Sequence, residues 1–297
     1  DMPGYMAAPR KAGKFATVIV IPEIFGMHEY QKDICRRLAK AGYVGITLDP
    51  FFRKGDLAKI SDIKQVLSAA NSLDDATMLA DHLVLMLATQ SKSITKIHAS
   101  EIAMYDDYPV AETMRDAMGF GLPLDATPYL AYPGAIAFQW GPGLRLIADG
   151  LGYRIDEVRE RFDRVATDRD LHVAFGTAEA GTCGALRTQA IAVIDGREAI
   201  IIEHVNRLDP DLGLEWGDRV DRPVYQVHIE GEPDIVCTMN ASLRDPGASG
   251  SAMEAGAGAM VSTAMRVVNA IPYVVQSDPG LLTALDLPLT LPRNVLR

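Results

Sequence analysis

The first fifty residues change their hydrophobic period twice. Residues 17–21, TVIVI, form a continuous apolar run that predicts a buried strand. The next segment has helical spacing and ends at Gly42, with its periodic positions at Asp33, Ile34, Arg37, Leu38 and Ala41. Residues 43–49, YVGITLD, predict a second strand. Two apolar strands joined through a helix predict a right-handed βαβ unit with parallel pairing.

Helical spacing over residues 59–90 predicts one or two further helices, with Ser72 or Asp74 as an N-cap. The pattern changes after about residue 93. We expect a strand over residues 94–105, followed by helices over residues 109–121, 135–152 and 154–166, the second interrupted by Pro142 and Gly143.

Long β segments follow over residues 171–239, with turn signals at Asp195-Gly196 and Glu230-Gly231, and they predict an antiparallel sheet. A last helix is expected over residues 260–271, where Pro272 ends it. The predicted fold class is therefore an α/β N-terminal βαβ segment plus an α+β C-terminal domain with a mainly antiparallel sheet.

Composition narrows the class of protein. The 297 residues are 48% apolar, and 39 acidic against 29 basic residues give a net charge of −10, which disfavours nucleic acid or an anionic membrane as a partner. No stretch has the form of a signal peptide or an uninterrupted membrane span. Cys35, Cys183 and Cys237 are far apart, as expected of reduced thiols in a cytoplasmic protein. The first residue, Asp1, fits either a processed product or a fragment.

The segment VIVIPEIFGMHEYQKDICRRLAKAGYVGITLDPFF resembles the dienelactone hydrolase family of α/β-hydrolases, over roughly residues 1–80. The resemblance implies that Glu23 interacts with a resting cysteine nucleophile and that the backbone N–H of Ile24 helps to form an oxyanion hole. The nucleophile should follow on a strand-to-helix elbow. The nearest matches are GTCGA around Cys183 and GASGS around Ser249, and neither has the expected strand–turn–helix context.

From about residue 81 to the C-terminus the chain resembles dihydrodipicolinate-reductase-like amine dehydrogenases, typified by 2,4-diaminopentanoate dehydrogenase. The resemblance rests on SKSITKIHASEIAMYDDYP, FGTAEAGTCGALRTQAIAVIDG, YQVHIEGEP and MVSTAMRVVNAIPYVV. It implies a substrate-binding and oligomerisation domain, an amine or amino-acid-like substrate, a homo-oligomer and an NAD(P) cofactor. The cofactor should lie on an N-terminal Rossmann domain.

The Rossmann signature, G-x-G-x-x-G, brings the backbone close to the pyrophosphate at a helix N-terminus. Here the same place reads PEIFGMHEY, with the single glycine Gly26 and the acidic Glu23. Asp49, at the end of the next strand, mimics a ribose-binding acid by position, although the hydrolase-like family has an acid there as well. We therefore assign no cofactor-binding residues.

The candidate substrate residues are Glu101, Tyr105 and Asp106, because an amine favours carboxylates and a proton-transfer partner. The run YDDYP is also typical of a turn or a helix cap. His204 alternates with apolar residues and is a further candidate acid or base, or a structural histidine like His98 and His228. No spacing suggests a metal site. Glu23 is a candidate only if the chain is a hydrolase.

The favoured hypothesis is a composite chain. Residues 1–80 are a partial hydrolase-like βαβ segment, and residues 81–297 are a reductase-like substrate and assembly domain. The chain then descends from an NAD(P)-dependent amine or imine oxidoreductase and has weak or no hydride transfer. A hydrolase without its nucleophile elbow, a non-catalytic oligomeric binding module and an accidental fusion remain as alternatives.

Overall fold

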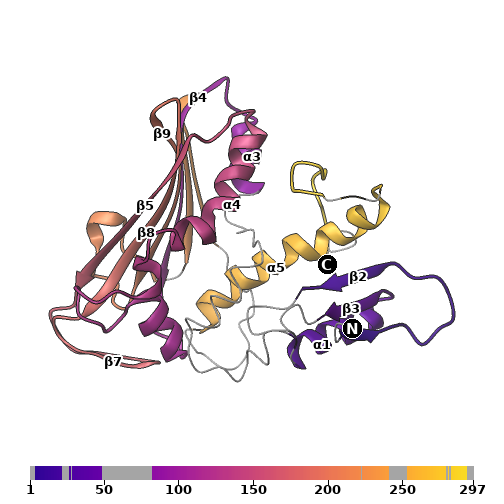
Figure 1. Cartoon of the computed structure of the whole chain (residues 1–297), viewed down its shortest axis with the longest axis horizontal. Coiled ribbons are helices and arrows are strands. Elements are labelled where there is room, and N and C mark those ends of the chain that lie inside the picture. The colour runs from indigo at the N-terminus through magenta and orange to yellow at the C-terminus, as the bar shows by residue number, and fades with distance from the viewer. Residues whose placement is uncertain are drawn as a thin grey trace. The chain divides into compact units, whose positions relative to one another are not determined.

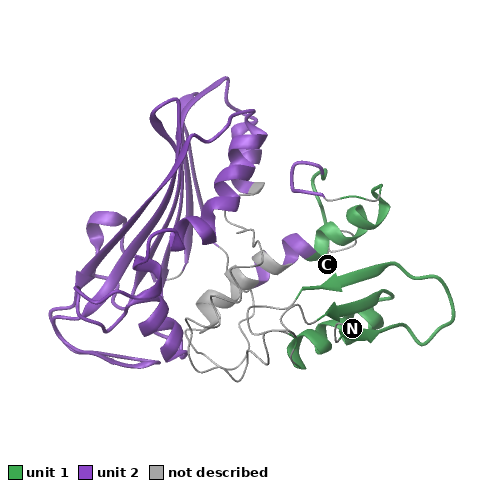
Figure 2. Cartoon of the chain, in the orientation of Figure 1, with its two compact units in different colours: residues 1–74, 268–281, 287–297 green, residues 75–267, 282–286 purple. Residues whose placement is uncertain are grey.

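The computed structural model divides into two compact units (Figure 2), which are described separately. One comprises residues 1–74, 268–281 and 287–297, and the other comprises residues 75–267 and 282–286. The structure describes residues 4–21, 27, 29–48, 82–221, 223–240, 253–278, 280 and 282–292.

The first unit contains a three-stranded sheet and a helix. Its elements are β1 (Gly4–Ala7), β2 (Thr17–Val20), α1 (Glu29–Lys40) and β3 (Val44–Leu48), with strand order β1-β3-β2. β2 and β3 are parallel and joined through α1, so the predicted βαβ unit is present. β1 adds an antiparallel strand that was not expected. Gly45 lets β3 approach α1 closely, because a Cβ there would lie 2.7 Å from the Cα of Cys35.

A six-stranded sheet dominates the second unit (Figure 1). Its strands, in spatial order, are β11 (Ile235–Asn240), β10 (Val224–Glu232), β4 (Ser93–Met104), β9 (Arg197–Arg207), β8 (Cys183–Ile194) and β5 (Glu157–Ala166). The central pair, β4 and β9, is parallel, whereas the other four pairs are antiparallel. The sheet is therefore mixed: it is mainly antiparallel, as predicted, but its central pair is parallel.

Two helices contact the sheet and define its helix-covered face. They are α3 (His82–Ala88) and α4 (Ala135–Gly150). α4 packs Ile136, Leu144 and Ile147 against buried strand residues such as Ala190 and Ile202. Burying side chains of this kind stabilises the fold by about 1.5–3 kcal/mol each.

Short elements complete the unit. They are the π-helix η3 (Thr113–Met118), the 3-10 helices η4 (Tyr129–Ala131) and η5 (Leu214–Trp216), and the hairpin strands β6 (Leu171–Val173) and β7 (Gly176–Ala178). The π-helix lies where an ordinary helix was predicted. The long helix α5 (Met253–Gln276) is the last regular element.

The helix predicted over residues 154–166 is wrong, because most of this segment forms the edge strand β5. Its charges are spaced as in a helix, but its apolar residues follow a period of two. Val158 and Phe162 pack on the helix-covered core, while Arg161 and Asp163 point to the other face. On that face Arg187 contacts Asp163 across the strand pair at 2.5 Å. Tertiary pairing therefore overrides the local helical charge pattern.

Three predicted interruptions do not occur. α4 continues through Pro142 and α5 continues through Pro272. Glu230-Gly231 is not a turn either, because β10 runs on to Glu232 with an irregular register at this point. In α4 the cost of the missing proline N–H is offset by packing of the helix on the sheet.

The N-terminus of α4 is capped from the sheet. The Glu160 carboxylate of β5 accepts hydrogen bonds from the backbone N–H groups of Gly134 (2.8 Å) and Ala137 (2.5 Å). These amides have no partner within the helix, and a negative charge also complements the helix dipole. Glu160 thereby fixes α4, and with it Trp140, relative to the sheet.

Replacing Glu160 with Gln should lower the free energy of unfolding by about 1 kcal/mol, the usual scale for loss of a capping interaction. The measurement is the urea midpoint of the full chain. Glu157→Gln is the matched control, because Glu157 lies on the same strand and its carboxylate contacts the exposed Arg159 instead of a helix N-terminus. Equal midpoints for the two variants would contradict the capping role.

Candidate functional site

A transverse polar row crosses four adjacent strands on the helix-covered face. It consists of Tyr225, Glu101, His204 and Thr188, from β10, β4, β9 and β8. The strand register pairs Tyr225 with Glu101, Glu101 with His204, and His204 with Thr188. Paired residues on neighbouring strands share a face. Four residues that are far apart in the sequence therefore form one continuous polar line.

Glu101 and His204 are the centre of this row. The Nδ1 atom of His204 lies 3.5 Å from Oε2 of Glu101, and both side chains are only about one-seventh exposed, at 14% and 15%. Burial lowers the pKa of His204, although Glu101 and Glu203 oppose the shift. The imidazole is therefore neutral near pH 7. With a proton on Nδ1 facing the carboxylate, Nε2 is left as a base.

Two tyrosines border the Glu101 carboxylate. Burial raises the pKa of Tyr105 and of Tyr225, and the negative charge of Glu101 adds to both shifts. The Tyr225 phenol also hydrogen-bonds to Glu101. Both phenols are therefore protonated at physiological pH and can act as hydrogen-bond donors. Tyr105 is fixed further by its backbone N–H, which donates to the carbonyl of Arg207.

Four polar atoms around the row are buried and have no hydrogen-bond partner among the described residues. They are His204 Nε2, Thr188 Oγ1, Trp140 Nε1 and Asn206 Nδ2. The Trp140 ring contacts the His204 ring, with centroids 4.8 Å apart. Leaving a buried polar atom without a partner costs about 1–3 kcal/mol. Such a group of unsatisfied atoms beside a carboxylate makes this face the candidate binding site.

The structure thus brings together three of the residues predicted from the sequence, namely Glu101, Tyr105 and His204. Asp106 is separate: its backbone carbonyl accepts from Ala174, and its charge acts on Asp107. Glu23, Ile24, Gly26, Asp49 and Ser249 lie outside the described residues.

Sequence reasoning missed Tyr225, Trp140, Thr188 and Asn206. The signal that identifies Tyr225 and Thr188 is the strand register, which local patterns do not contain. Trp140 is found only through the packing of α4.

The other two histidines of the six-stranded sheet, His98 and His228, have structural partners on the opposite face. His98 contacts Glu203 at 3.3 Å, and His228 contacts Asp234 at 3.0 Å. Burial alone would raise the pKa of Glu203, but contacts with His98 and Gln189 hold it below its usual value. Glu203 is therefore a charged, structural residue.

Cys183 has the wrong environment for a nucleophile. It begins β8, is fully buried, and burial raises the pKa of its thiol to about 12. Cys35 is equally buried, in α1, and its pKa is also raised by burial. Reactive cysteines need a lowered pKa and some exposure.

Within the described ranges, no cluster of three or more His, Cys, Asp or Glu residues is arranged to hold a metal ion. In the same part of the chain, no helix combines the length and apolar character that crossing a membrane requires.

Two family models match the chain. The 2,4-diaminopentanoate dehydrogenase C-terminal domain matches residues 78–295, and the dienelactone hydrolase family matches residues 2–100. The first match covers most of the chain and includes the whole transverse polar row. The chain belongs to the 2,4-diaminopentanoate dehydrogenase C-terminal domain family. The composite resemblance predicted from the sequence is confirmed.

Individual relatives show the same division. An amine dehydrogenase of Streptomyces virginiae is 31% identical over 282 residues, which are 94% of this chain and 72% of that protein. A 2,4-diaminopentanoate dehydrogenase of Acetoanaerobium sticklandii is 24% identical over 223 residues, 74% of this chain and 56% of its own. A putative carboxymethylenebutenolidase of Methylorubrum extorquens is 41% identical, but only over 81 residues, 27% of this chain and 28% of that protein.

Among solved structures, the amine dehydrogenase from Mycobacterium smegmatis matches with a TM-score of 0.52 at 15% identity. The match covers 94% of this chain and 77% of that one. It supports a shared fold.

The lowered pKa of His204 predicts a pH dependence of stability. Below the usual histidine pKa of about 6.5, the unfolded chain binds a proton that the folded chain does not bind until a lower pH. Stability contributed by neutral His204 is therefore present above about pH 6.5 and decreases as the pH falls. Between pH 7.5 and pH 5.5, the free energy of unfolding should fall less for His204→Asn than for the wild type. The measurement is urea denaturation at both pH values. Parallel losses in the two proteins would contradict this assignment.

Proposed function

We propose that this chain binds a small primary amine or amino-acid-like amine at the transverse polar row. In this proposal, residues 81–297 are the substrate-binding and oligomerisation domain of an NAD(P)-dependent amine or imine oxidoreductase. Residues 1–80 are a partial hydrolase-like βαβ segment, and hydride transfer by this chain is weak or absent. The observation that carries the proposal is the Glu101–His204 pair, flanked by Tyr105 and Tyr225.

Glu101 supplies the charge that recognises an ammonium group. Its side chain is mostly removed from water, where the attraction between opposite charges is stronger than at an open surface. A carboxylate has about four lone-pair positions, so contacts with His204 and Tyr225 leave some of them for a ligand. The Tyr225 phenol hydrogen-bonds to the carboxylate and keeps it in place.

His204 provides the proton acceptor. An amine enters as the ammonium ion and must lose a proton before its nitrogen lone pair can take part in imine chemistry. His204 is neutral, its Nδ1 is oriented by Glu101, and its Nε2 has no partner among the described residues. This is the arrangement expected of a general base oriented by a carboxylate. Glu101 is thus the cation-binding residue and His204 the proton acceptor.

The residues of the N-terminal unit do not fit a dinucleotide. In the βαβ unit a diphosphate would lie at the N-terminus of α1, where backbone amides favour an anion. That first turn carries the acidic Glu29, whose side chain is 73% exposed. The preceding sequence, PEIFGMHEY, offers one glycine instead of three. We therefore assign no step through NAD(P), and propose that the family cofactor is bound weakly or not at all.

The proposed homo-oligomer forms through the sheet face opposite α3 and α4. That face is charged, with the Arg161–Glu198 contact at 2.7 Å and the buried Glu203 near its centre. The proposal also includes a cytoplasmic location and excludes nucleic acid and membranes as partners, in line with the net charge of −10.

Amine binding can be tested with sec-butylamine, whose amino carbon carries the hydrogen that dehydrogenation removes. In a Trp216→Phe background, Trp140 is the remaining tryptophan and contacts His204, so its fluorescence should change saturably with the amine. Glu101→Gln should weaken binding at least about tenfold, because a charge-assisted hydrogen bond contributes about 1.5–3 kcal/mol.

Glu230→Gln is the matched control, since Glu230 is an exposed carboxylate on β10 that contacts Lys96. Butyrate, an anion with the same number of carbons, should give no saturable change. Equal amine affinity for Glu101→Gln and Glu230→Gln would refute the assignment of Glu101.

Cofactor binding is tested separately by titrating the chain into NADPH and recording nicotinamide fluorescence. We expect no saturable change at millimolar chain concentration, because Glu29 and the missing glycines disfavour the diphosphate. Tight NADPH binding, or nicotinamide-dependent turnover of sec-butylamine, would overturn the proposal of weak or absent hydride transfer while leaving amine binding intact.

A further inference from the structure

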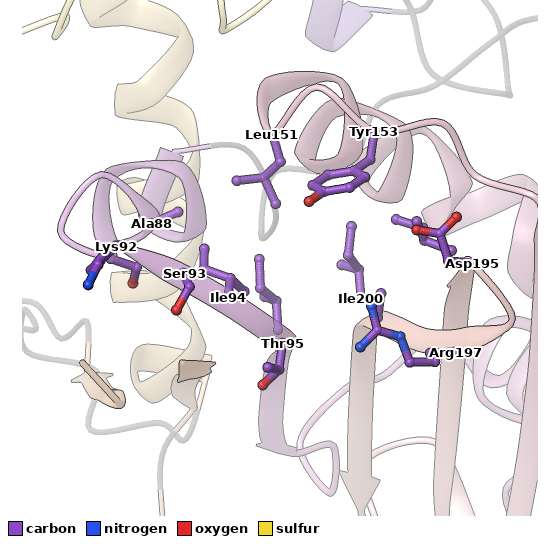
Figure 3. A pocket seen from close by; sticks show the side chains of 14 residues that line it. Ala88, Lys92, Ser93, Ile94, Thr95, Leu151, Tyr153, Asp195, Arg197 and Ile200 are labelled. Atoms are coloured by element: carbon purple, nitrogen blue, oxygen red, sulfur yellow. The ribbon is translucent and has the colours of Figure 1, made fainter. Parts of the chain in front are cut away.

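A cavity of about 260 Å³ lies at the other end of the six-stranded sheet (Figure 3). It is enclosed by the first residues of β4 and β9, the end of β8, and the C-terminal ends of α3 and α4. At about 30 Å³ per water-sized group, it holds about nine such groups. This is enough space for a small metabolite.

The cavity exists because β4 and β9 separate. Their parallel pairing begins at Ile97 and Ile200, and the residues before these two pair only with the outer neighbours β10 and β8. Each strand has one extra residue just before this point, Thr95 in β4 and Ala199 in β9. Both extra residues line the cavity. Such bulges bend a strand and leave backbone groups unpaired, and they are common next to binding sites.

The floor of the cavity is apolar. Ile97 and Ile200 are fully or almost fully buried, at 0% and 1% exposure, and Ile94 and Ile194 extend this surface. Figure 3 shows Leu151 and Tyr153 on one side of the space and Ile94 and Ile200 on the other. The floor therefore suits a short hydrocarbon chain.

The rim of the cavity is polar and carries a net positive charge. Lys92 and Arg197 lie on opposite sides of the cavity, where β4 and β9 separate. Neither side chain has an ion pair or hydrogen bond among the described residues. Asp195, in the β8–β9 turn, is the acidic residue of the lining. The Ser91 hydroxyl is buried and has no hydrogen-bond partner in this part of the chain. Two cations, one acid and a free hydroxyl favour a small anion.

We propose that this cavity is a binding site for a short aliphatic carboxylate. The hydrocarbon chain lies on Ile94, Ile97 and Ile200, and the carboxylate lies at the rim, where the positive charges of Lys92 and Arg197 favour an anion. Ser91 donates a hydrogen bond to the ligand. The site is separate from the transverse polar row, because Glu101 is four residues further along β4 than Ile97, about 13 Å at 3.3 Å per residue.

The test is a titration of the full chain, labelled with ¹³C at isoleucine δ-methyl groups, with sodium hexanoate. The methyl signals of Ile94, Ile97, Ile194 and Ile200, assigned by Ile→Val substitution, should shift saturably. Hexylamine has the same hydrocarbon chain with the opposite charge, and should bind at least about tenfold more weakly at these signals. Shifts that do not saturate, that spread over isoleucines outside the lining, or that are equal for the two probes would overturn the proposal.

Variants test the contacts of the carboxylate and of the hydrocarbon chain separately. Lys92→Ala and Arg197→Ala should each weaken hexanoate binding about three- to fivefold, as expected for exposed charges. Lys96→Ala is the matched control, because Lys96 is a lysine of β4, close in sequence to Lys92, that contacts Glu230 and does not line the cavity.

Ala88→Phe, which places a ring in the cavity from α3, should abolish binding. Unchanged hexanoate affinity in the Lys92→Ala, Arg197→Ala double variant would refute the site. This result does not depend on whether Ala88→Phe folds.

Discussion

The parallel pairing of β4 and β9 at the centre of the sheet is the constraint on which the rest of the second unit depends. Eight residue pairs run from Ile97–Ile200 to Met104–Arg207. One of them sets Glu101 beside His204, and a shift of one residue would turn one of these side chains to the opposite face. Where the pairing starts, the two strands separate and leave the cavity between them. One register therefore determines the position of both proposed binding sites.

The same register divides polar side chains between two faces with different physical roles. On the face away from the helices, His98 and Gln189 satisfy Glu203, and long charged side chains pair with one another. On the helix-covered face, Glu101 and His204 lie among polar atoms that have no partner in the described structure. Unsatisfied groups cost stability, so a fold retains them where a ligand supplies the missing contacts. This contrast favours Glu101 and His204 as the candidate site, although His98 Nε2 on the opposite face also lacks a well-oriented hydrogen bond among the described residues.

Much of the local structure could be predicted from the sequence, whereas the pairing of distant strands could not. The βαβ unit was predictable because its strands are apolar throughout and its helix ends at a glycine with positive φ, Gly42. β5 was misassigned because its charges have helical spacing while its burial has a period of two. The sequence indicates Glu101 and His204 as two separate candidates, because each is an ionisable residue in a predicted strand. Their contact depends on a parallel register between segments that are a hundred residues apart, and Tyr225 and Thr188 join the row through the same pairing.

The N-terminal segment bears on how the site can be used. A carboxylate and a neutral imidazole can bind an amine and accept its proton, but oxidation to an imine also needs a hydride acceptor held next to the amino carbon. The family match covers the residues proposed for the first two functions, and the hydrolase-like match covers the place where the third would be expected. At that place α1 begins with an acidic residue, and the preceding sequence lacks the glycines that let backbone amides contact a diphosphate. The proposed amine recognition depends only on residues of the C-terminal sheet and its covering helix, so it does not require the hydride transfer that this chain is proposed to lack.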